Sequence, residues 1–167
     1  MIQATSLARR LEVLPIEKRK VILGISGGLD STQALLVATK TMDLLGLPRK
    51  NIIGITMPGF GTTDRTYQNA VELVNSIGAA FKEIPIRDLS MLIFKAVGHD
   101  EKIHNFTYEN TQAWSRKYIE LATASEQGGI VLGTGDLSEL WLGWCTMYGD
   151  HASHYGVNSS IPKTLIS

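Results

Sequence analysis

Hydrophobic residues are concentrated in four short runs, and the segments between these runs are long enough for helices. The runs cover residues 21–25, 51–56, 80–86 and 129–134, and each is rich in residues that favour strands. Strands that alternate with helices are typical of parallel sheets, because a parallel pair needs a long crossover connection. The pattern therefore predicts an α/β fold: a three-layer, doubly wound, mostly parallel sheet with helices on both faces.

The segments between the predicted strands carry apolar residues at helical spacing. Gly46 and Gly78 follow two of these segments as C-terminal caps, and Asp88 is placed to cap a third at its N-terminus. The predicted helices cover residues 5–14, 31–45, 63–77, 88–97, 107–127 and 136–143. Beyond residue 143 the chain is polar, aromatic and dotted with glycine, which is typical of a functional loop beside a sheet.

Composition narrows the class of protein. The chain has 167 residues, of which 44% are hydrophobic and 19% are charged, so we expect one folded domain. Its 16 basic residues balance its 16 acidic ones, which argues against a nucleic-acid partner. Cys145 is the only cysteine, and no stretch reaches the roughly 18 apolar residues of a membrane helix. We expect a soluble, cytoplasmic protein with no membrane partner.

The sequence GISGGLDS, directly after the first predicted strand, admits three interpretations. Its first five residues fit G-x-S-x-G, in which Ser26 would be a hydrolase nucleophile with His151 or His154 as its base. It also fits an ordinary turn in which Asp30 or Ser31 caps the next helix. As a phosphate-binding loop, its glycines would expose backbone N–H groups, its serines would donate hydroxyls, and the helix would add its positive end. The loop comprises Gly24, Ile25, Ser26, Gly27, Gly28, Leu29, Asp30 and Ser31.

Asp30 is the informative residue of this loop. A carboxylate repels phosphates unless a divalent cation lies between the two groups. Under the phosphate-binding interpretation, Asp30 therefore predicts Mg²⁺ held against the phosphates. The loop is not a Walker A sequence, because no Gly-Lys-Ser/Thr follows the glycines.

The segment SGGLDS resembles the pyrophosphate-binding loop of the ATP pyrophosphatases, which adenylate a substrate and release pyrophosphate. Three later segments resemble NAD synthetase within that superfamily, especially the synthetase domain of the glutamine-dependent type: ENTQAWSRKY, GGIVLGTGDLSELWLGWCTMYGDHASHYGVN and IPKT. The resemblance covers residues 19–166 and implies an adenine nucleotide alpha hydrolase-like fold. It also implies amidation of deamido-NAD to NAD through an adenylate, with ATP as co-substrate, Mg²⁺ as metal, and AMP and pyrophosphate as products.

The resemblance implies roles for individual residues. The loop from Gly24 to Ser31 and Thr134 would contact ATP, Lys163 would neutralise phosphate, and Glu139 would approach both metal and substrate. Asp30 and Glu139 both follow predicted strands, at the sheet edge where doubly wound folds bind ligands, so the two carboxylates can share Mg²⁺. The residues expected to line the deamido-NAD pocket are Asn110, Trp144, Cys145, Thr146 and Met147.

Each of these residues also has a purely structural interpretation. Glu139 alone fits a solvated helix residue, and Thr134 fits a cap for the helix that follows it. Trp141 and Trp144 are three residues apart and fit one helix face packed in the core or against a second subunit. The two histidines named above fit loop or capping roles better than metal ligation, because the sequence offers no third donor near them.

The chain departs from the family pattern at one substrate contact. The family often has arginine after the dipeptide QA, where this chain has Trp114, so Arg116 becomes the candidate substitute. Glutamine-dependent members also carry an amidase domain with a Glu-Lys-Cys centre that makes ammonia. Because Cys145 lies in the synthetase segment, we expect the amidase domain of the full-length protein to lie outside this chain.

The family continues with further helices beyond the position where IPKTLIS ends this chain, so we expect residues 1–167 to be a truncated synthetase domain. The family is commonly dimeric, so we expect a homodimer or higher oligomer. Two rival functions stay open at this stage. One is a nucleotide-binding fragment without complete activity, and the other is a different ATP pyrophosphatase such as a GMP-synthetase-like enzyme.

Overall fold

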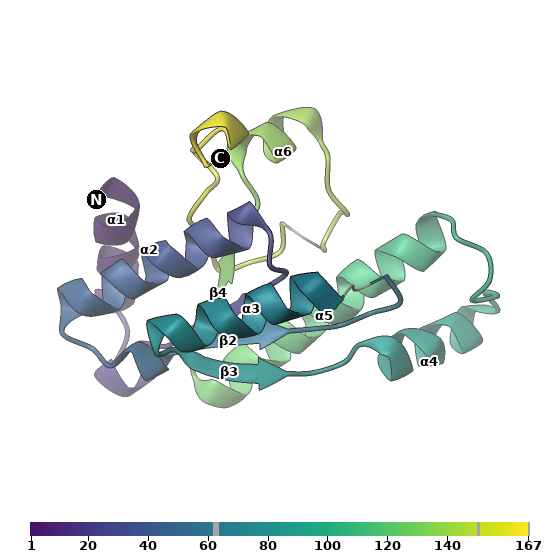
Figure 1. Cartoon of the computed structure of the whole chain (residues 1–167), viewed down its shortest axis with the longest axis horizontal. Helices are drawn as coiled ribbons and strands as arrows, with labels where there is room; N and C mark the ends of the chain where they lie inside the picture. Colours follow the sequence, from purple (N-terminus) through teal and green to yellow (C-terminus); the bar gives the residue numbers. More distant parts are fainter. Residues whose placement is uncertain (62–63, 150, 167) are drawn as a thin grey trace.

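Five parallel strands form the sheet of the computed structural model, which describes residues 1–61, 64–149 and 151–166 (Figure 1). The strands lie in the order β3-β2-β1-β4-β5, and every described pairing is parallel. Their bounds are β1 (Val21–Gly24), β2 (Ile52–Thr56), β3 (Ala80–Glu83), β4 (Ile130–Gly133) and β5 (Tyr155–Gly156). The predicted α/β fold is therefore confirmed.

The helices of the described residues follow the predicted order along the chain. They are α1 (Ile2–Glu12), α2 (Leu29–Leu45), α3 (Asp64–Ile77), α4 (Arg87–Val97), α5 (Phe106–Gln127) and α6 (Leu137–Leu142). Single turns of 3₁₀-helix cover Ile16–Lys18, Arg49–Asn51 and Lys163–Leu165. None of the described helices is both long and apolar enough to cross a membrane.

Alternation along the strands builds two hydrophobic layers. Val21 and Leu23 point from β1 into the layer that α1, α2 and α3 cover, whereas Ile22 points into the layer shared with α5. All three side chains are fully buried. Strands buried on both faces read as continuous apolar runs, which is why the sequence shows them clearly. Figure 1 shows α2 and α3 on one side of the sheet and α5 on the other.

Several helix boundaries differ from the sequence prediction. The helix α2 begins at Leu29, two residues earlier than expected, so Asp30 lies inside its first turn. The N-cap of α4 is Ile86, so the prediction that Asp88 caps this helix is wrong. The N-cap of α5 is Asn105, whose side chain accepts hydrogen bonds from two backbone N–H groups of the first turn. The left-handed glycine caps predicted at Gly46 and Gly78 are confirmed.

The strand order creates a switch point beside β1. The chain moves from β1 to β2 on one side of the sheet and later returns to place β4 on the other side. Loops that leave neighbouring strands in opposite directions open a crevice at their carboxyl ends, where open α/β sheets bind ligands. The loops after β1 and β4 meet at this crevice.

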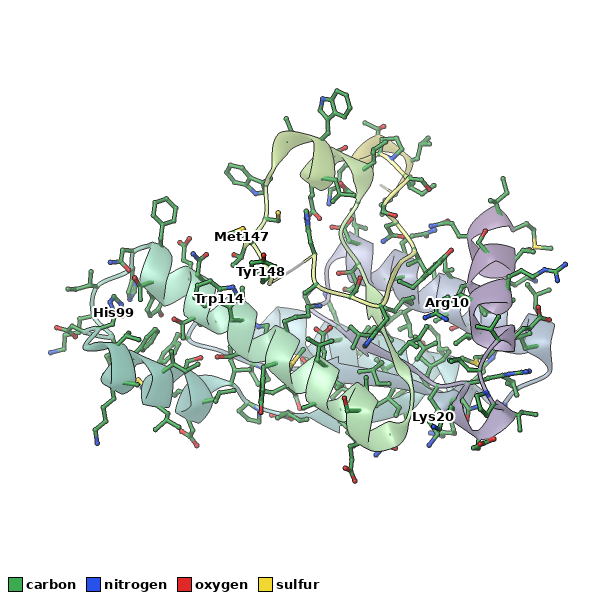
Figure 2. The ribbon with its side chains drawn as sticks, turned by 180° about the vertical axis from the view of Figure 1, so that it is seen from behind. Arg10, Lys20, His99, Trp114, Met147 and Tyr148 are labelled. Atoms are coloured by element: carbon green, nitrogen blue, oxygen red, sulfur yellow. The ribbon has the colours of Figure 1, made fainter. Side chains whose placement is uncertain are left out.

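The segment after α6 folds back over α5. Figure 2 shows Met147 and Tyr148 beside Trp114 of α5. The indole Nε1 of Trp114 donates a hydrogen bond to the backbone oxygen of Met147 over 2.8 Å. Tyr148 has a left-handed backbone, with φ of 58°. Trp114 therefore anchors the loop that the sequence indicated to be functional.

Candidate active site

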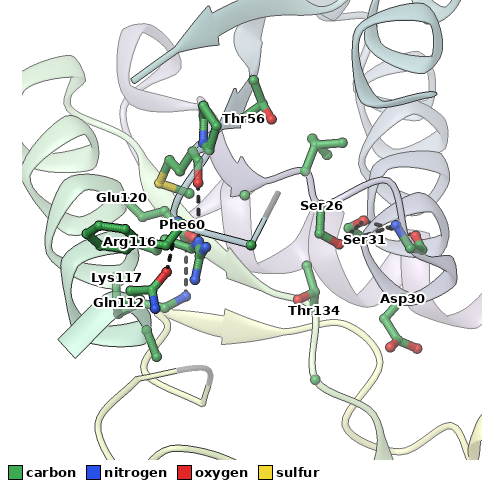
Figure 3. A pocket seen from close by; sticks show the side chains of 18 of the residues that line it. Ser26, Asp30, Ser31, Thr56, Phe60, Gln112, Arg116, Lys117, Glu120 and Thr134 are labelled. Carbon is green, nitrogen blue, oxygen red and sulfur yellow. Dashed lines mark hydrogen bonds and ion pairs between the residues drawn. The ribbon is translucent and has the colours of Figure 1, made fainter. Parts of the chain in front are cut away.

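A cavity of about 740 Å³ opens at the carboxyl edge of the sheet (Figure 3). The loops after β1, β2 and β4 line it together with one face of α5. Its volume lies within the range of small-molecule sites. The predicted site residues that line it are Gly24, Ile25, Ser26, Gly28, Asp30, Ser31, Thr134, Glu139 and Trp144.

The loop between β1 and α2 has the geometry of an anion cradle. Gly27 has φ of 79°, a left-handed conformation that favours glycine. Ser31 Oγ donates to the backbone oxygen of Gly28 over 3.0 Å and lies 3.3 Å from Ser26 Oγ. These contacts hold both hydroxyls at the cavity wall, beside the first turn of α2, whose backbone N–H groups have no acceptor within the helix. Backbone donors, hydroxyls and the helix dipole thus converge on one point.

Among the described residues, no histidine forms a hydrogen bond with Ser26. The described contacts of its hydroxyl are the Ser31 hydroxyl at 3.3 Å and the backbone nitrogen of Gly28 at 3.3 Å. His154 is engaged elsewhere, because its Nδ1 accepts a hydrogen bond from the backbone nitrogen of Val131. A nucleophilic serine needs a base within hydrogen-bond reach. The geometry therefore disfavours the hydrolase interpretation of the G-x-S-x-G match.

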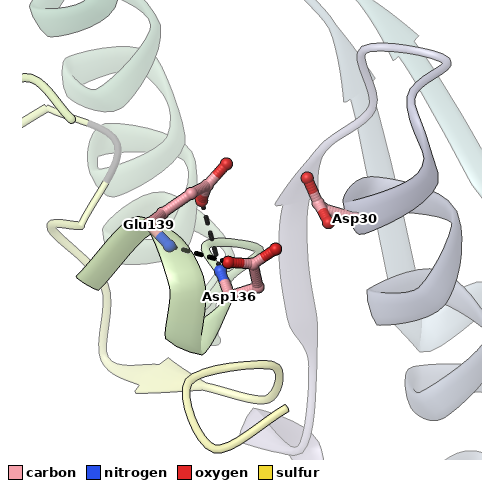
Figure 4. A group of neighbouring side chains, drawn as sticks. All are labelled: Asp30, Asp136 and Glu139. Carbon is pink, nitrogen blue, oxygen red and sulfur yellow. Dashed lines mark hydrogen bonds between the residues drawn. The ribbon is translucent and has the colours of Figure 1, made fainter. Parts of the chain in front are cut away.

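Three carboxylates meet across the crevice between β1 and β4 (Figure 4). Asp30, Asp136 and Glu139 each offer an oxygen, and these oxygens all lie within 4.8 Å of one another. The sequence indicated Asp30 and Glu139 but missed Asp136. The sequence does contain a signal for Asp136: it precedes α6 as the N-cap, and Glu139 follows three residues later, which is the spacing of a capping box.

The capping box fixes the geometry of this carboxylate cluster. The backbone nitrogen of Glu139 donates to Asp136 Oδ1 over 2.8 Å, and the backbone nitrogen of Asp136 donates to Glu139 Oε2 over 3.2 Å. Asp136 is fully buried. The helix cap is therefore Asp136, and the prediction that Thr134 caps this helix is wrong.

Lys163 supplies the positive charge of the cluster. Its Nζ lies 2.5 Å from Asp30 Oδ2, 2.8 Å from Asp136 Oδ2 and 3.5 Å from Glu139 Oε1. Burial alone would lower the pKa of Lys163, but the hydrogen bonds to Asp136 and Asp30 outweigh burial and raise it. The pKa of Asp136 is lowered because Lys163 and two backbone N–H groups outweigh the opposing effect of burial. All four groups thus face one another in a compact charged cluster.

The cluster suits a hard divalent cation such as Mg²⁺, which prefers carboxylate oxygens. Asp30 Oδ1 is buried and accepts no hydrogen bond from the described residues. A buried carboxylate oxygen without a donor is costly unless a cation approaches it. Neither His151 nor His154 belongs to the cluster of potential ligands found among the described residues.

Asn158 connects the two sides of the crevice, and no sequence motif singled it out. Its side chain is fully buried, and its Nδ2 donates to the backbone oxygens of Asp30 and Thr134, each over 3.0 Å. One amide group therefore joins the loop after β1 to the loop after β4. Asn158 is 128 residues from Asp30 along the chain, so no local pattern links them.

Of the residues expected to contact deamido-NAD, Glu139 and Trp144 line the described cavity, whereas Asn110, Cys145, Thr146 and Met147 do not. Asn110 accepts a hydrogen bond from Thr146 Oγ1 over 3.0 Å, which attaches the loop to α5. Cys145 Sγ lies 3.3 Å from His151 Nδ1. These contacts give Asn110, Cys145 and Thr146 a role in holding the loop, while their contact with substrate stays a prediction.

Trp114 stands where the family often has arginine, and the structure places Arg116, the candidate substitute, at the cavity. Trp114 holds the loop through Met147, whereas Arg116 lines the cavity and donates from Nε to the backbone oxygen of Met57 over 3.2 Å. Arg116 thus presents its charge to the cavity, as its suggested substitute role requires. Trp141 and Trp144 are 86% and 80% exposed, so the prediction that they pack in the core is wrong.

Comparison with known proteins gives one consistent family. The family model described as NAD synthase matches residues 2–165. A glutamine-dependent NAD(+) synthetase from Mycobacterium leprae is 49% identical over 99% of this chain, and one from Thermotoga maritima is 33% identical over 87% of it. The chain spans about a quarter of these curated relatives, 25% of each.

Solved structures agree with the sequence comparison. A glutamine-dependent NAD+ synthetase from Acinetobacter baumannii, in complex with ADP, matches with a TM-score of 0.88 and 26% identity. The match covers 98% of this chain and 30% of that one. The NH3-dependent NAD synthetase from Campylobacter jejuni matches with a TM-score of 0.83 and 26% identity, over 98% of this chain and 67% of that one.

Proposed function

This chain belongs to the NAD synthase family, and on that premise we propose that it is the ATP-binding synthetase part of a glutamine-dependent NAD synthetase. In this role it adenylates deamido-NAD with ATP and then converts the adenylate to NAD with ammonia. The observation that carries the proposal is the meeting of the glycine loop and the three-carboxylate cluster at one crevice. The relative from Acinetobacter baumannii is in complex with ADP, which supports binding of an adenine nucleotide.

The first step joins deamido-NAD to ATP. An oxygen of the nicotinate carboxylate attacks the α-phosphorus, the bond from that phosphorus to the bridging oxygen breaks, and pyrophosphate leaves with the electron pair. The loop after β1 holds the phosphates through backbone N–H groups and the hydroxyls of Ser26 and Ser31. A held pyrophosphate leaves more easily, because charge that develops on it meets fixed donors.

Asp30, Asp136 and Glu139 are the residues that would hold Mg²⁺. The metal, when bound, neutralises charge on the departing pyrophosphate. Lys163 adds a second positive group that faces the same carboxylates. When a nucleotide binds, the ammonium group of Lys163 can turn toward the phosphate oxygens.

The second step forms the amide. Ammonia attacks the carbonyl carbon of the adenylate, the bond to the phosphate oxygen breaks, AMP leaves, and the nitrogen loses one proton. A glutamine amidase domain of the full-length protein supplies the ammonia, as the glutamine-dependent relatives suggest. Trp144 and Arg116 line the cavity and are the candidates to position the substrate. The homodimer and the cytoplasmic location expected from the sequence stay predictions.

One incubation tests the proposal. The chain is mixed with ATP, Mg²⁺, deamido-NAD and ammonium, and AMP, pyrophosphate and NAD are measured separately. We expect all three products in equal amounts. Pyrophosphate and adenylate without NAD would assign only the first step to this chain. Nucleotide binding without any product would instead support the binding-fragment alternative, and products from GMP precursors in a parallel incubation would support a different ATP pyrophosphatase.

A further inference from the structure

A buried ion pair lies in the cavity wall formed by α5. Lys117 Nζ donates to Glu120 Oε2 over 2.8 Å, and the two side chains are only 9% and 7% exposed. Both residues nevertheless line the cavity. Figure 3 shows them on the wall opposite Ser26 and Ser31 of the phosphate loop. The mechanism proposed above assigns them no task.

The ion pair lies next to apolar residues of the same helix. The neighbouring α5 residues Ile119, Leu121 and Ala124 belong to the hydrophobic layer beneath the sheet. A buried ion pair often stabilises a protein no more than apolar residues of the same volume, because both charges lose water. A buried pair that also faces a cavity is therefore a candidate for recognition of a ligand.

The pair presents a donor beside an acceptor. Lysine has three N–H donors, and the described residues accept one of those of Lys117, at Glu120 Oε2. Glu120 Oε1 reaches the end of β1, where a Cβ on Gly24 would lie 2.5 Å from it. Glycine at the end of the strand thus leaves room for the carboxylate at the base of the cavity. The pair itself has no net charge, which suits a neutral polar group better than a phosphate, whereas Arg116 is a separate positive group that also lines the cavity.

Adenine matches this arrangement. On its base edge an amino group, a donor, stands beside a ring nitrogen, an acceptor. Guanine and hypoxanthine carry a carbonyl oxygen in place of the amino group, so a carboxylate facing that position would meet an acceptor. The phosphate loop fixes the other end of the nucleotide, which limits how far the base can shift to escape that mismatch.

We propose that Lys117 and Glu120 select the adenine base of the nucleotide, with Glu120 accepting from the 6-amino group and Lys117 donating to the adjacent ring nitrogen. The proposal rests on the proposed function, in that the phosphate loop must hold a nucleoside triphosphate. It adds a specificity determinant on α5 that lies apart from the loop and from the carboxylate cluster.

The test compares ATP with inosine triphosphate, which differs at the 6-position. Both are titrated with Mg²⁺ into the 167-residue chain by calorimetry, and we expect ATP to bind about 10- to 100-fold more tightly. The double variant Lys117→Met with Glu120→Leu removes both charges together, so no buried charge is left alone. It should lose the preference and keep its melting temperature.

A second variant reverses the pair. Lys117→Glu combined with Glu120→Lys keeps an ion pair in the wall but exchanges donor and acceptor, so we expect the preference to shift toward inosine triphosphate. The matched control is Asp43→Leu with Arg49→Met, which removes an exposed ion pair outside the cavity and should leave the preference unchanged.

The outcomes separate this proposal from the proposed function. If the wild-type chain binds neither nucleotide, the proposed function fails. If it binds ATP and inosine triphosphate equally, or if either pair variant keeps the wild-type preference, the pair does not select the base, while the proposed function stands.

Discussion

Lys163 Nζ lies 2.5 Å from Asp30 Oδ2, although the two residues are 133 positions apart in the sequence. The contact joins the last turn of 3₁₀-helix to the first turn of α2, across the crevice between β1 and β4. The same ammonium also reaches Asp136 and Glu139. In the structure, Lys163 thus occupies the position of the cation that the three carboxylates attract.

Replacing Lys163 should strengthen metal binding and weaken nucleotide binding. Without nucleotide, Lys163→Met removes the cation that competes for the carboxylates, so Mn²⁺ binding should tighten by about tenfold, or about 1.4 kcal/mol. ATP binding should weaken, because a positive group near the phosphates is lost. Mn²⁺ titration followed by electron paramagnetic resonance measures the first effect, and calorimetry the second. The exposed Lys40→Met is the control, and weaker Mn²⁺ binding by Lys163→Met would refute competition.

The negative charge of Asp136 should stabilise the folded state at neutral pH but not at strongly acidic pH. Its pKa is lowered below the ordinary value of 3.8, so the folded state favours the ionised form. The contribution of this charge to the unfolding free energy is fully present above pH 3.8, the ordinary pKa of aspartate. It is lost as the pH falls through the lower pKa of Asp136 in the folded state. Asp136→Asn keeps a residue that caps helices but removes the charge. The difference in unfolding free energy between wild type and variant should be constant above about pH 5 and shrink below about pH 4. A difference that does not change with pH would contradict this.

The side-chain amide of Asn158 should contribute strongly to stability, because it links the two sides of the crevice. Asn158→Asp replaces the amide donor by an acceptor of the same size that faces the backbone oxygens of Asp30 and Thr134. We expect a loss of about 2 to 4 kcal/mol in unfolding free energy, because two hydrogen bonds are lost and a charge is buried. Urea unfolding measures the loss. Asn75→Asp on the exposed side of α3 should change stability little, and equal effects of the two substitutions would argue against a linking role.

Gly129 should tolerate no side chain, because the chain passes close to it at the start of β4. A Cβ there would lie 2.7 Å from the backbone oxygen of Lys20 and 2.7 Å from Ile22 Cδ1. Gly129→Ala should therefore lower the unfolding free energy by about 1 to 3 kcal/mol. Gly61→Ala is the control, because no atom of the described residues beyond its chain neighbours lies within 4 Å of its added Cβ. Thermal unfolding that is identical in both variants would contradict the close approach.

The layers of the fold could be predicted from the sequence because the central strands β1, β2 and β4 are continuous apolar runs. The short edge strand β5 could not, because it comprises only Tyr155 and Gly156 and its register depends on Leu132 of the neighbouring strand. The sequence predicts the start of α2 two residues too late, since the glycines before Leu29 carry no apolar pattern. Local periodicity therefore locates the sheet but not its edges.

Candidate site residues can be predicted from the sequence where they directly follow a strongly apolar strand. Asp30 was indicated by its conflict with a phosphate loop, and the structure places it among carboxylates. The metal-binding hypothesis did not include Asp136, because the sequence pattern marks it as the start of a helix and as a candidate acid of the hydrolase interpretation. Asn158 acts through two backbone oxygens that the fold brings to it, and such contacts leave no local signal.

The most direct test of the central claim is calorimetric titration of ATP into the 167-residue chain, with and without Mg²⁺, for the wild type and for Asp30→Ala. The claim is that the loop after β1 and the carboxylates beside it bind ATP together with its metal. Wild type should bind ATP more tightly when Mg²⁺ is present, and Asp30→Ala should lose most of that enhancement while staying folded. ATP affinity that Mg²⁺ leaves unchanged in the wild type, or an Mg²⁺ enhancement undiminished in Asp30→Ala, would contradict the claim.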